Sequence, residues 1–113
     1  MVYDTARQLA KELCESEEYR AFMEQKEQVS EDATTKALLN QYHKLQIKAQ
    51  AAVVSGEKND ALMQELQKLG ELLQMNKDAS NYLIAEYRVN KLLSDIYKIL
   101  GDAVGVDLSA LEN

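Results

Sequence analysis

Apolar residues recur along this chain at steps of three and four, which is the spacing of one buried face of an α-helix. Short runs rich in Ser, Asp, Asn and Gly interrupt that pattern and divide it into segments. The pattern predicts five helices, at about residues 4–15, 17–30, 33–55, 60–75 and 79–101, followed by a loose tail over 106–113.

Capping residues support these boundaries. Asp4 or Thr5 is expected to begin the first helix, Ser16 the second and Asp32 the third, because short polar side chains accept hydrogen bonds from free backbone N–H groups. Gly56 is expected to end the third helix, with Asn59 or Asp60 beginning the fourth, and Asp78 to cap the last. The short link over 55–60 predicts that the third and fourth helices lie antiparallel.

Three of the predicted helices carry a stripe with steps of four and three, close to the heptad repeat of helices that pack along their length. Leu39, Ile47, Val53 and Val54 widen the stripe on the third helix. Such stripes exceed what one thin chain is expected to cover, so we predict association between copies. The residues expected to form this seam are Leu38, Tyr42, Leu45, Ala49, Leu62, Leu66, Leu69, Leu73, Val89, Leu93, Ile96 and Leu100.

Length and composition agree with this architecture. The chain has 113 residues, no Pro and only four Gly, whereas a β-sandwich of this size needs many turns. We therefore expect one helical domain over residues 1–113, an all-α antiparallel bundle of four to five helices that forms a homo-oligomer.

Charge is distributed unevenly along the chain. The net charge is −6, which disfavours nucleic acid and anionic membranes as generic partners. Residues 33–56 nevertheless contain Lys36, Lys44 and Lys48 and no acid, whereas residues 1–32 are strongly acidic. The basic helix either lies beside the acidic one, in the same chain or in a neighbour, or offers a weak docking strip for anions.

Tyr87 and Arg88 lie off the main stripe of the last helix. We therefore predict that these two residues, together with the three lysines, contact partners.

Little in the sequence indicates catalysis. Cys14 is surrounded by acids, which do not favour a reactive thiolate, and is expected to be a small buried residue. His43 has no carboxylate near it in sequence, and the residue three before it is Asn40, so the Glu-x-x-His motif of di-iron bundles is absent. No phosphate-binding loop or zinc motif is present. We predict no enzyme, no cofactor or metal and no small-molecule substrate.

No signal peptide or membrane span is apparent in the sequence, and we expect a cytoplasmic protein.

Two segments resemble the YlbF/YmcA/YheA family of small helical bacterial proteins: LAKELCESEEYRAFMEQKEQVSEDATTKALLNQYHKLQIKAQ over 9–50 and YLIAEYRVNKLLSDIYKIL over 82–100. The resemblance implies an all-α fold, dimers or higher oligomers, and the cytoplasm of a Gram-positive-type bacterium. It also implies regulation, with partner proteins, of competence, sporulation and biofilm development by influencing the mRNA-processing ribonuclease Y. Iron–sulfur ligation by cysteines near the C-terminus, found in certain members, does not carry over, because no Cys follows Cys14.

The sequence thus predicts a non-enzymatic helical oligomer that acts by binding other regulatory proteins. The alternative is an RNA-associated factor that uses the basic strip on the third helix, with copies adding their lysines together.

Overall fold

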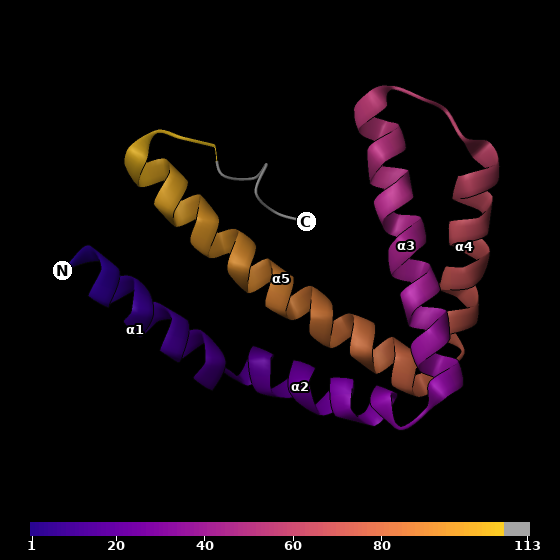
Figure 1. Cartoon of the computed structure of the whole chain (residues 1–113), viewed down its shortest axis with the longest axis horizontal. Coiled ribbons are helices and arrows are strands. Elements are labelled where there is room, and N and C mark those ends of the chain that lie inside the picture. Colours follow the sequence, from indigo (N-terminus) through magenta and orange to yellow (C-terminus); the bar gives the residue numbers. More distant parts are fainter. Residues whose placement is uncertain (108–113) are drawn as a thin grey trace. The chain divides into compact units, whose positions relative to one another are not determined.

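The computed structural model describes residues 1–107 and contains, within them, five α-helices and no strand (Figure 1). They are α1 (Val2–Glu15), α2 (Glu17–Ser30), α3 (Ala33–Ser55), α4 (Asp60–Gln74) and α5 (Lys77–Val104). The prediction of an all-α protein is confirmed. The described residues form two compact units, one made of residues 25–82 and one of residues 1–24 with the chain from Leu83 onward.

The expected caps of α2, α3 and α4 are present. The Ser16 hydroxyl accepts a hydrogen bond from the backbone N–H of Tyr19, and the Asp32 carboxylate accepts from the N–H groups of Thr34 and Thr35. The Asn59 side chain accepts from the N–H of Leu62. These are the donors that the first turn of a helix leaves free, so the caps fix where each helix begins.

Helix α3 ends as expected at Gly56, whose φ of 77° is left-handed. The following N–H, of Glu57, reaches back to the carbonyl oxygen of Ala52 at 2.9 Å. This is the Schellman arrangement, in which glycine is preferred because a Cβ atom is disfavoured at positive φ.

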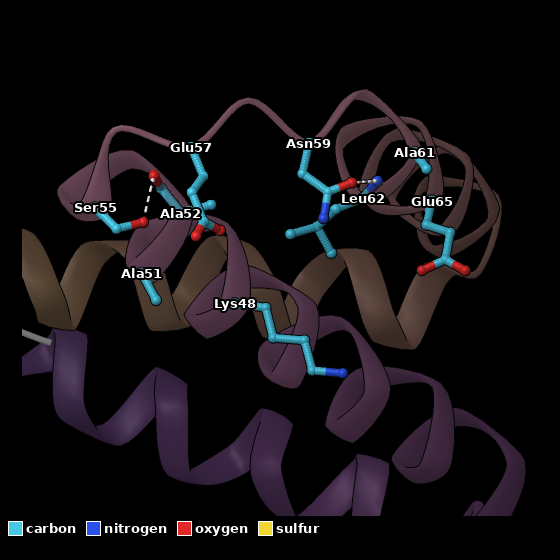
Figure 2. A pocket seen from close by; sticks show the side chains of 9 residues that line it. All are labelled: Lys48, Ala51, Ala52, Ser55, Glu57, Asn59, Ala61, Leu62 and Glu65. Atoms are coloured by element: carbon cyan, nitrogen blue, oxygen red, sulfur yellow. Dashed lines mark hydrogen bonds between the residues drawn. The ribbon is translucent and has the colours of Figure 1, made fainter.

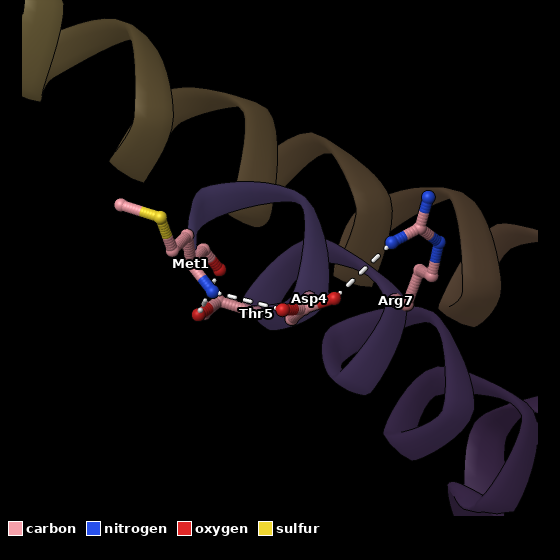
Figure 3. A network of polar contacts seen from close by, with 4 residues as sticks. All are labelled: Met1, Asp4, Thr5 and Arg7. Atoms are coloured by element: carbon pink, nitrogen blue, oxygen red, sulfur yellow. Dashed lines mark hydrogen bonds and ion pairs between the residues drawn. The ribbon is translucent and has the colours of Figure 1, made fainter.

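Two expected helix starts were wrong. Helix α1 begins at Val2, so Asp4 lies inside its first turn, where its carboxylate accepts from the Met1 amino group and from Arg7 (Figure 3). Helix α5 begins at Lys77, and its cap is Asn76 rather than Asp78, since Asn76 Oδ1 accepts from the N–H of Ala79 at 3.1 Å.

The last helix is also longer than expected. It continues to Val104 and ends at Gly105, with the N–H of Val106 bonded to the carbonyl of Gly101. Of the expected tail, residues 108–113 lie outside the described part.

In the unit of residues 25–82, α3 and α4 pack together as an antiparallel hairpin. Their direction follows from two contacts: Thr35 near the start of α3 bonds to Asn76 beyond the end of α4, and Gly70 lies against Tyr42. The buried residues of this unit are Val29, Thr35, Leu39, Leu45, Ala49, Leu69, Leu73 and Ala79. The prediction of antiparallel neighbours is therefore confirmed for these two helices.

A polar junction, formed by Asp32, Thr35 and Asn76, closes the open end of this hairpin. The fully buried Thr35 hydroxyl donates to the Asp32 carboxylate at 2.8 Å and accepts from the Asn76 amide at 2.9 Å. Asn76 also caps α5. One amide therefore joins the start of α3 to the start of α5, across 41 residues of sequence.

The other unit contains α1, the first part of α2 and most of α5. Ala85 is buried in it, and Leu9, Leu13, Leu93 and Ile96 are half-buried. Cys14, expected to be buried, is exposed. Its place at the edge of a thin amphipathic helix leaves the thiol on the solvent side.

Candidate interaction surfaces

The solvent face of α3 carries the three lysines that the sequence marks as partner contacts. Lys36, Lys44 and Lys48 are all exposed. Within the described chain none of them forms an ion pair, and α3 itself contains no acid. The α3 helix therefore presents to solvent three ammonium groups that form no ion pair.

Apolar side chains share this face. Ile47 and Val54 are 66% and 88% exposed, and Val53 is 73% exposed. The expectation that these three widen the buried stripe was wrong; of that group only Leu39 is buried. Helix geometry gives the reason, since Ile47 is about 200° around the helix from the buried Leu45. The result is an exposed surface of mixed apolar and cationic character, which is typical of contact surfaces more than of solvated ones.

A groove opens at the loop end of the hairpin, between α3 and α4 (Figure 2). It has a volume of about 610 Å³. Small side chains form much of its wall, and its charges are one ammonium and two carboxylates. The residues that line it are Lys48, Ala51, Ala52, Ser55, Glu57, Asn59, Ala61, Leu62 and Glu65. Lys48 thus belongs both to the exposed face of α3 and to this groove.

The remaining two predicted contact residues lie together on the other unit. Tyr87 is 67% exposed and Arg88 is also exposed, as the sequence predicts. Both line a shallow hollow of about 210 Å³, whose other walls are Glu18, Lys91, Leu92 and Asp95. Lys91 is already paired with Asp95 at 3.1 Å, so the polar groups that this hollow offers to a partner are those of Tyr87, Arg88 and Glu18.

The expected seam is partly covered by the chain itself. Leu45, Ala49, Leu69 and Leu73 are buried between α3 and α4, and Leu38, Tyr42, Leu62 and Leu66 are half-buried. On α5, Val89, Leu93 and Ile96 are half-buried and Leu100 is 48% exposed. Contact between copies through the seam remains a prediction, and its innermost residues are already buried without one.

Within residues 1–107, no group of three or more His, Cys, Asp or Glu side chains lies close enough to hold a metal ion. His43 is half-buried, with its ring centroid 6.2 Å from that of Tyr82.

Hydrogen bonds from the Thr35 hydroxyl, then from the Thr35 and Thr34 N–H groups, hold the pKa of Asp32 below its usual range. Across the described residues, no helix is both long and apolar enough to span a bilayer.

Sequence reasoning missed the junction residues Thr35 and Asn76. Local signals exist for both, since Thr35 is three residues after a capping Asp and Asn76 is a residue type that is favoured at helix N-caps. Their hydrogen bond to each other, between distant parts of the chain, has no signal in one sequence.

The helices, the hairpin with its polar junction and the exposed faces of mixed character define the class, which is an all-α protein. The chain matches, over residues 2–105, the family model described as control of competence regulator ComK, YlbF/YmcA. It is 39% identical over 108 residues to a UPF0342 protein of Symbiobacterium thermophilum, covering 95% of this chain and 96% of that relative. A UPF0342 protein of Halothermothrix orenii is 35% identical to this chain over 113 residues, and the match covers 99% of this chain and 94% of that relative. The chain belongs to the YlbF/YmcA family, and the resemblance is confirmed.

Proposed function

We propose that this chain is a non-enzymatic, cytoplasmic, self-associating regulatory protein that acts by binding other proteins. The observation that carries the proposal is the match over residues 2–105 to a family model described by control of a competence regulator. Competence, sporulation and biofilm development, linked through mRNA processing, are the processes that the family resemblance points to.

The exposed residues support binding as the mode of action. Tyr87 and Arg88 are adjacent, exposed and share one hollow. Tyr and Arg are enriched among the residues that dominate binding energy at protein interfaces, because each combines a large contact area with hydrogen bonding. We assign this pair to contact with a partner protein.

Complementation of a deletion tests the proposal. Removing the gene in its host is expected to change the abundance of a set of transcripts, and the wild-type gene is expected to restore them. The variant Tyr87→Ala/Arg88→Glu should fail to restore them while keeping wild-type helicity and unfolding midpoint. A matched control, Lys98→Glu, changes an exposed cation on the same helix that is paired with Asp102 at 3.7 Å, and should complement.

Unchanged transcripts after deletion would contradict a regulatory role. Full complementation by Tyr87→Ala/Arg88→Glu would instead remove this pair from the partner surface.

A second candidate function is RNA association, favoured by the three exposed, unpaired lysines of α3. Three phosphate contacts per chain give weak binding, which copies in an oligomer would multiply. A mobility-shift titration with single-stranded RNA at low salt tests it. Binding that weakens steeply as salt rises supports this candidate, and its absence at low salt ends it.

A further inference from the structure

The outward surface of α3 carries cations and exposed apolar side chains together, and α3 itself contains no acid. We define the α3 outward face by Lys36, Lys44, Lys48, Ile47 and Val54. At about 100° per residue these five positions fall within about 120° of the helix circumference. None of them is buried by the described chain. This face therefore lacks both a neutralising and an apolar partner.

Helix α2 carries the opposite surface. We define the α2 acidic face by Glu24 and Glu27, which lie within about 60° of the circumference of α2, together with Glu31, which directly follows the last residue of that helix. All three are exposed and none forms an ion pair in the described chain. Met23, 41% exposed, lies beside them, and Arg20 ends the acidic stretch one turn earlier. The charge of this face is therefore opposite to that of the α3 outward face.

We propose that the α3 outward face of one copy docks on the α2 acidic face of a second copy. The inference rests on the self-association in the proposed function and names the surfaces that carry it. Both complementary faces are present on one chain, so a second copy supplies each with what it lacks, and in a two-fold arrangement the contact occurs twice. Ile47, Val54 and Met23 provide the apolar contact beside the charged residues.

Charge complementarity favours this occupant over nucleic acid. The chain as a whole carries a net charge of −6, so an RNA approaching three lysines also meets the surrounding carboxylates. A second copy would instead place the glutamates of its α2 acidic face against these lysines, while its other carboxylates face solvent.

Charge reversal with mixing tests the proposal sharply. The first variant is Lys36→Glu/Lys44→Glu/Lys48→Glu, the second is Glu24→Lys/Glu27→Lys/Glu31→Lys, and the third combines all six changes. Lys36 lies at the start of α3, Glu27 lies in the last turn of α2, and Glu31 directly follows that helix. At Lys36 and Glu27 the new charges suit the helix dipole, which protects the fold. Circular dichroism and the unfolding midpoint confirm that each variant is folded.

The association of each variant is measured by sedimentation equilibrium at about 50 mM salt, where charge interactions are weakly screened. Each triple variant alone should dissociate at least about tenfold more readily than wild type, because three attractions become repulsions. Mixing the two triple variants in equal amounts should restore association, because the reversed faces again complement each other. The variant that combines all six substitutions should associate by itself, because both of its faces are reversed. High salt should weaken the wild-type assembly.

A control with the same change in net charge is Lys58→Glu/Lys68→Glu/Lys77→Glu, which alters three exposed lysines outside the α3 outward face. Its association should stay within about threefold of wild type.

Equal loss in this control, or no recovery on mixing, would overturn the assigned surfaces while leaving self-association in place. A wild-type chain that remains monomeric at every concentration would overturn this inference and the self-association in the proposed function together. The complementation test would still decide the regulatory role. Loss of RNA binding in the first variant, with its self-association unchanged, would overturn the inference in favour of RNA.

Discussion

Replacing Asn76 by Ala removes two hydrogen bonds at once. The amide donates to the buried Thr35 hydroxyl at 2.9 Å, and its oxygen accepts from the N–H of Ala79 at 3.1 Å as the cap of α5. The Thr35 hydroxyl keeps its own bond to the Asp32 carboxylate, so the substitution leaves no buried hydroxyl without a partner.

The magnitude follows from these two losses. Removing an N-cap side chain costs about 1 kcal/mol. A neutral hydrogen bond contributes a net of about 0.5–1.5 kcal/mol. We therefore expect Asn76→Ala to lower the free energy of unfolding by about 2 kcal/mol. Asn76→Ser keeps a capping oxygen but has no amide to reach Thr35, so it should lose about 1 kcal/mol.

Urea unfolding followed by circular dichroism measures both changes, and a double-mutant cycle with Thr35→Val isolates the bridge. The coupling energy between the two positions should be about 1 kcal/mol, because each single change already breaks the same bond. A loss below about 0.5 kcal/mol for Asn76→Ala would refute the role of the junction. Equal losses for the Ala and Ser variants would show that capping has no part in it.

Four further predictions follow from the same structure. Leu73→Ala, at a side chain with no exposed surface, should lower the free energy of unfolding by about 2–5 kcal/mol in urea titrations, and a cost near zero would contradict its place between α3 and α4. Gly70→Ala should raise the thermal midpoint, because the new Cβ meets Tyr42 Cε1 at an ordinary 3.6 Å while the helix gains about 1 kcal/mol of propensity; a lower midpoint would indicate an obligatory close approach. Gly56→Ala should lower the midpoint by the equivalent of about 1–2 kcal/mol, because the φ of 77° disfavours a Cβ, and an unchanged midpoint would mean that the loop reshapes freely. The pKa of Asp32 is lower in the folded chain, so its stabilisation is complete above the ordinary carboxyl pKa and is lost as pH falls through the folded one; Asp32→Asn should flatten that part of the acid unfolding curve, and identical curves would contradict the hydrogen bonds assigned to it.

Much of the fold was predictable because its signals are local. Asp32, Asn59 and Gly56 mark the ends of α3 and α4 through the hydrogen bonds of a single turn, which a sequence displays directly. The start of α5 was harder, because Asn76 and Asp78 are both good caps. The choice falls on Asn76, whose amide has a donor for Thr35 as well as an acceptor for the helix, and a carboxylate lacks that donor.

The surfaces were predictable only in part. Tyr87 and Arg88 stand off the apolar stripe of α5, so their exposure follows from helix geometry. The stripe of α3 shows which residues turn inward, but it does not show whether α4 of the same chain or a helix of another copy covers them. For Leu45 and Ala49 the cover is α4, and this depends on contacts between distant segments.

The α3 helix therefore has two separate tasks on opposite faces. Its inward face, with Leu45 and Ala49 against α4, holds the hairpin through burial that no partner has to complete. On its outward face, Lys44 and Lys48 form no ion pair within the described chain that would stabilise the hairpin. Ile47 on the same face is 66% exposed. Substitutions of the exposed side chains on this face are therefore expected to cost little stability. Residues that contribute so little to folding can serve binding without a cost in stability. The charge pattern of α3 is therefore a better guide to the contacts of this protein than its apolar stripe.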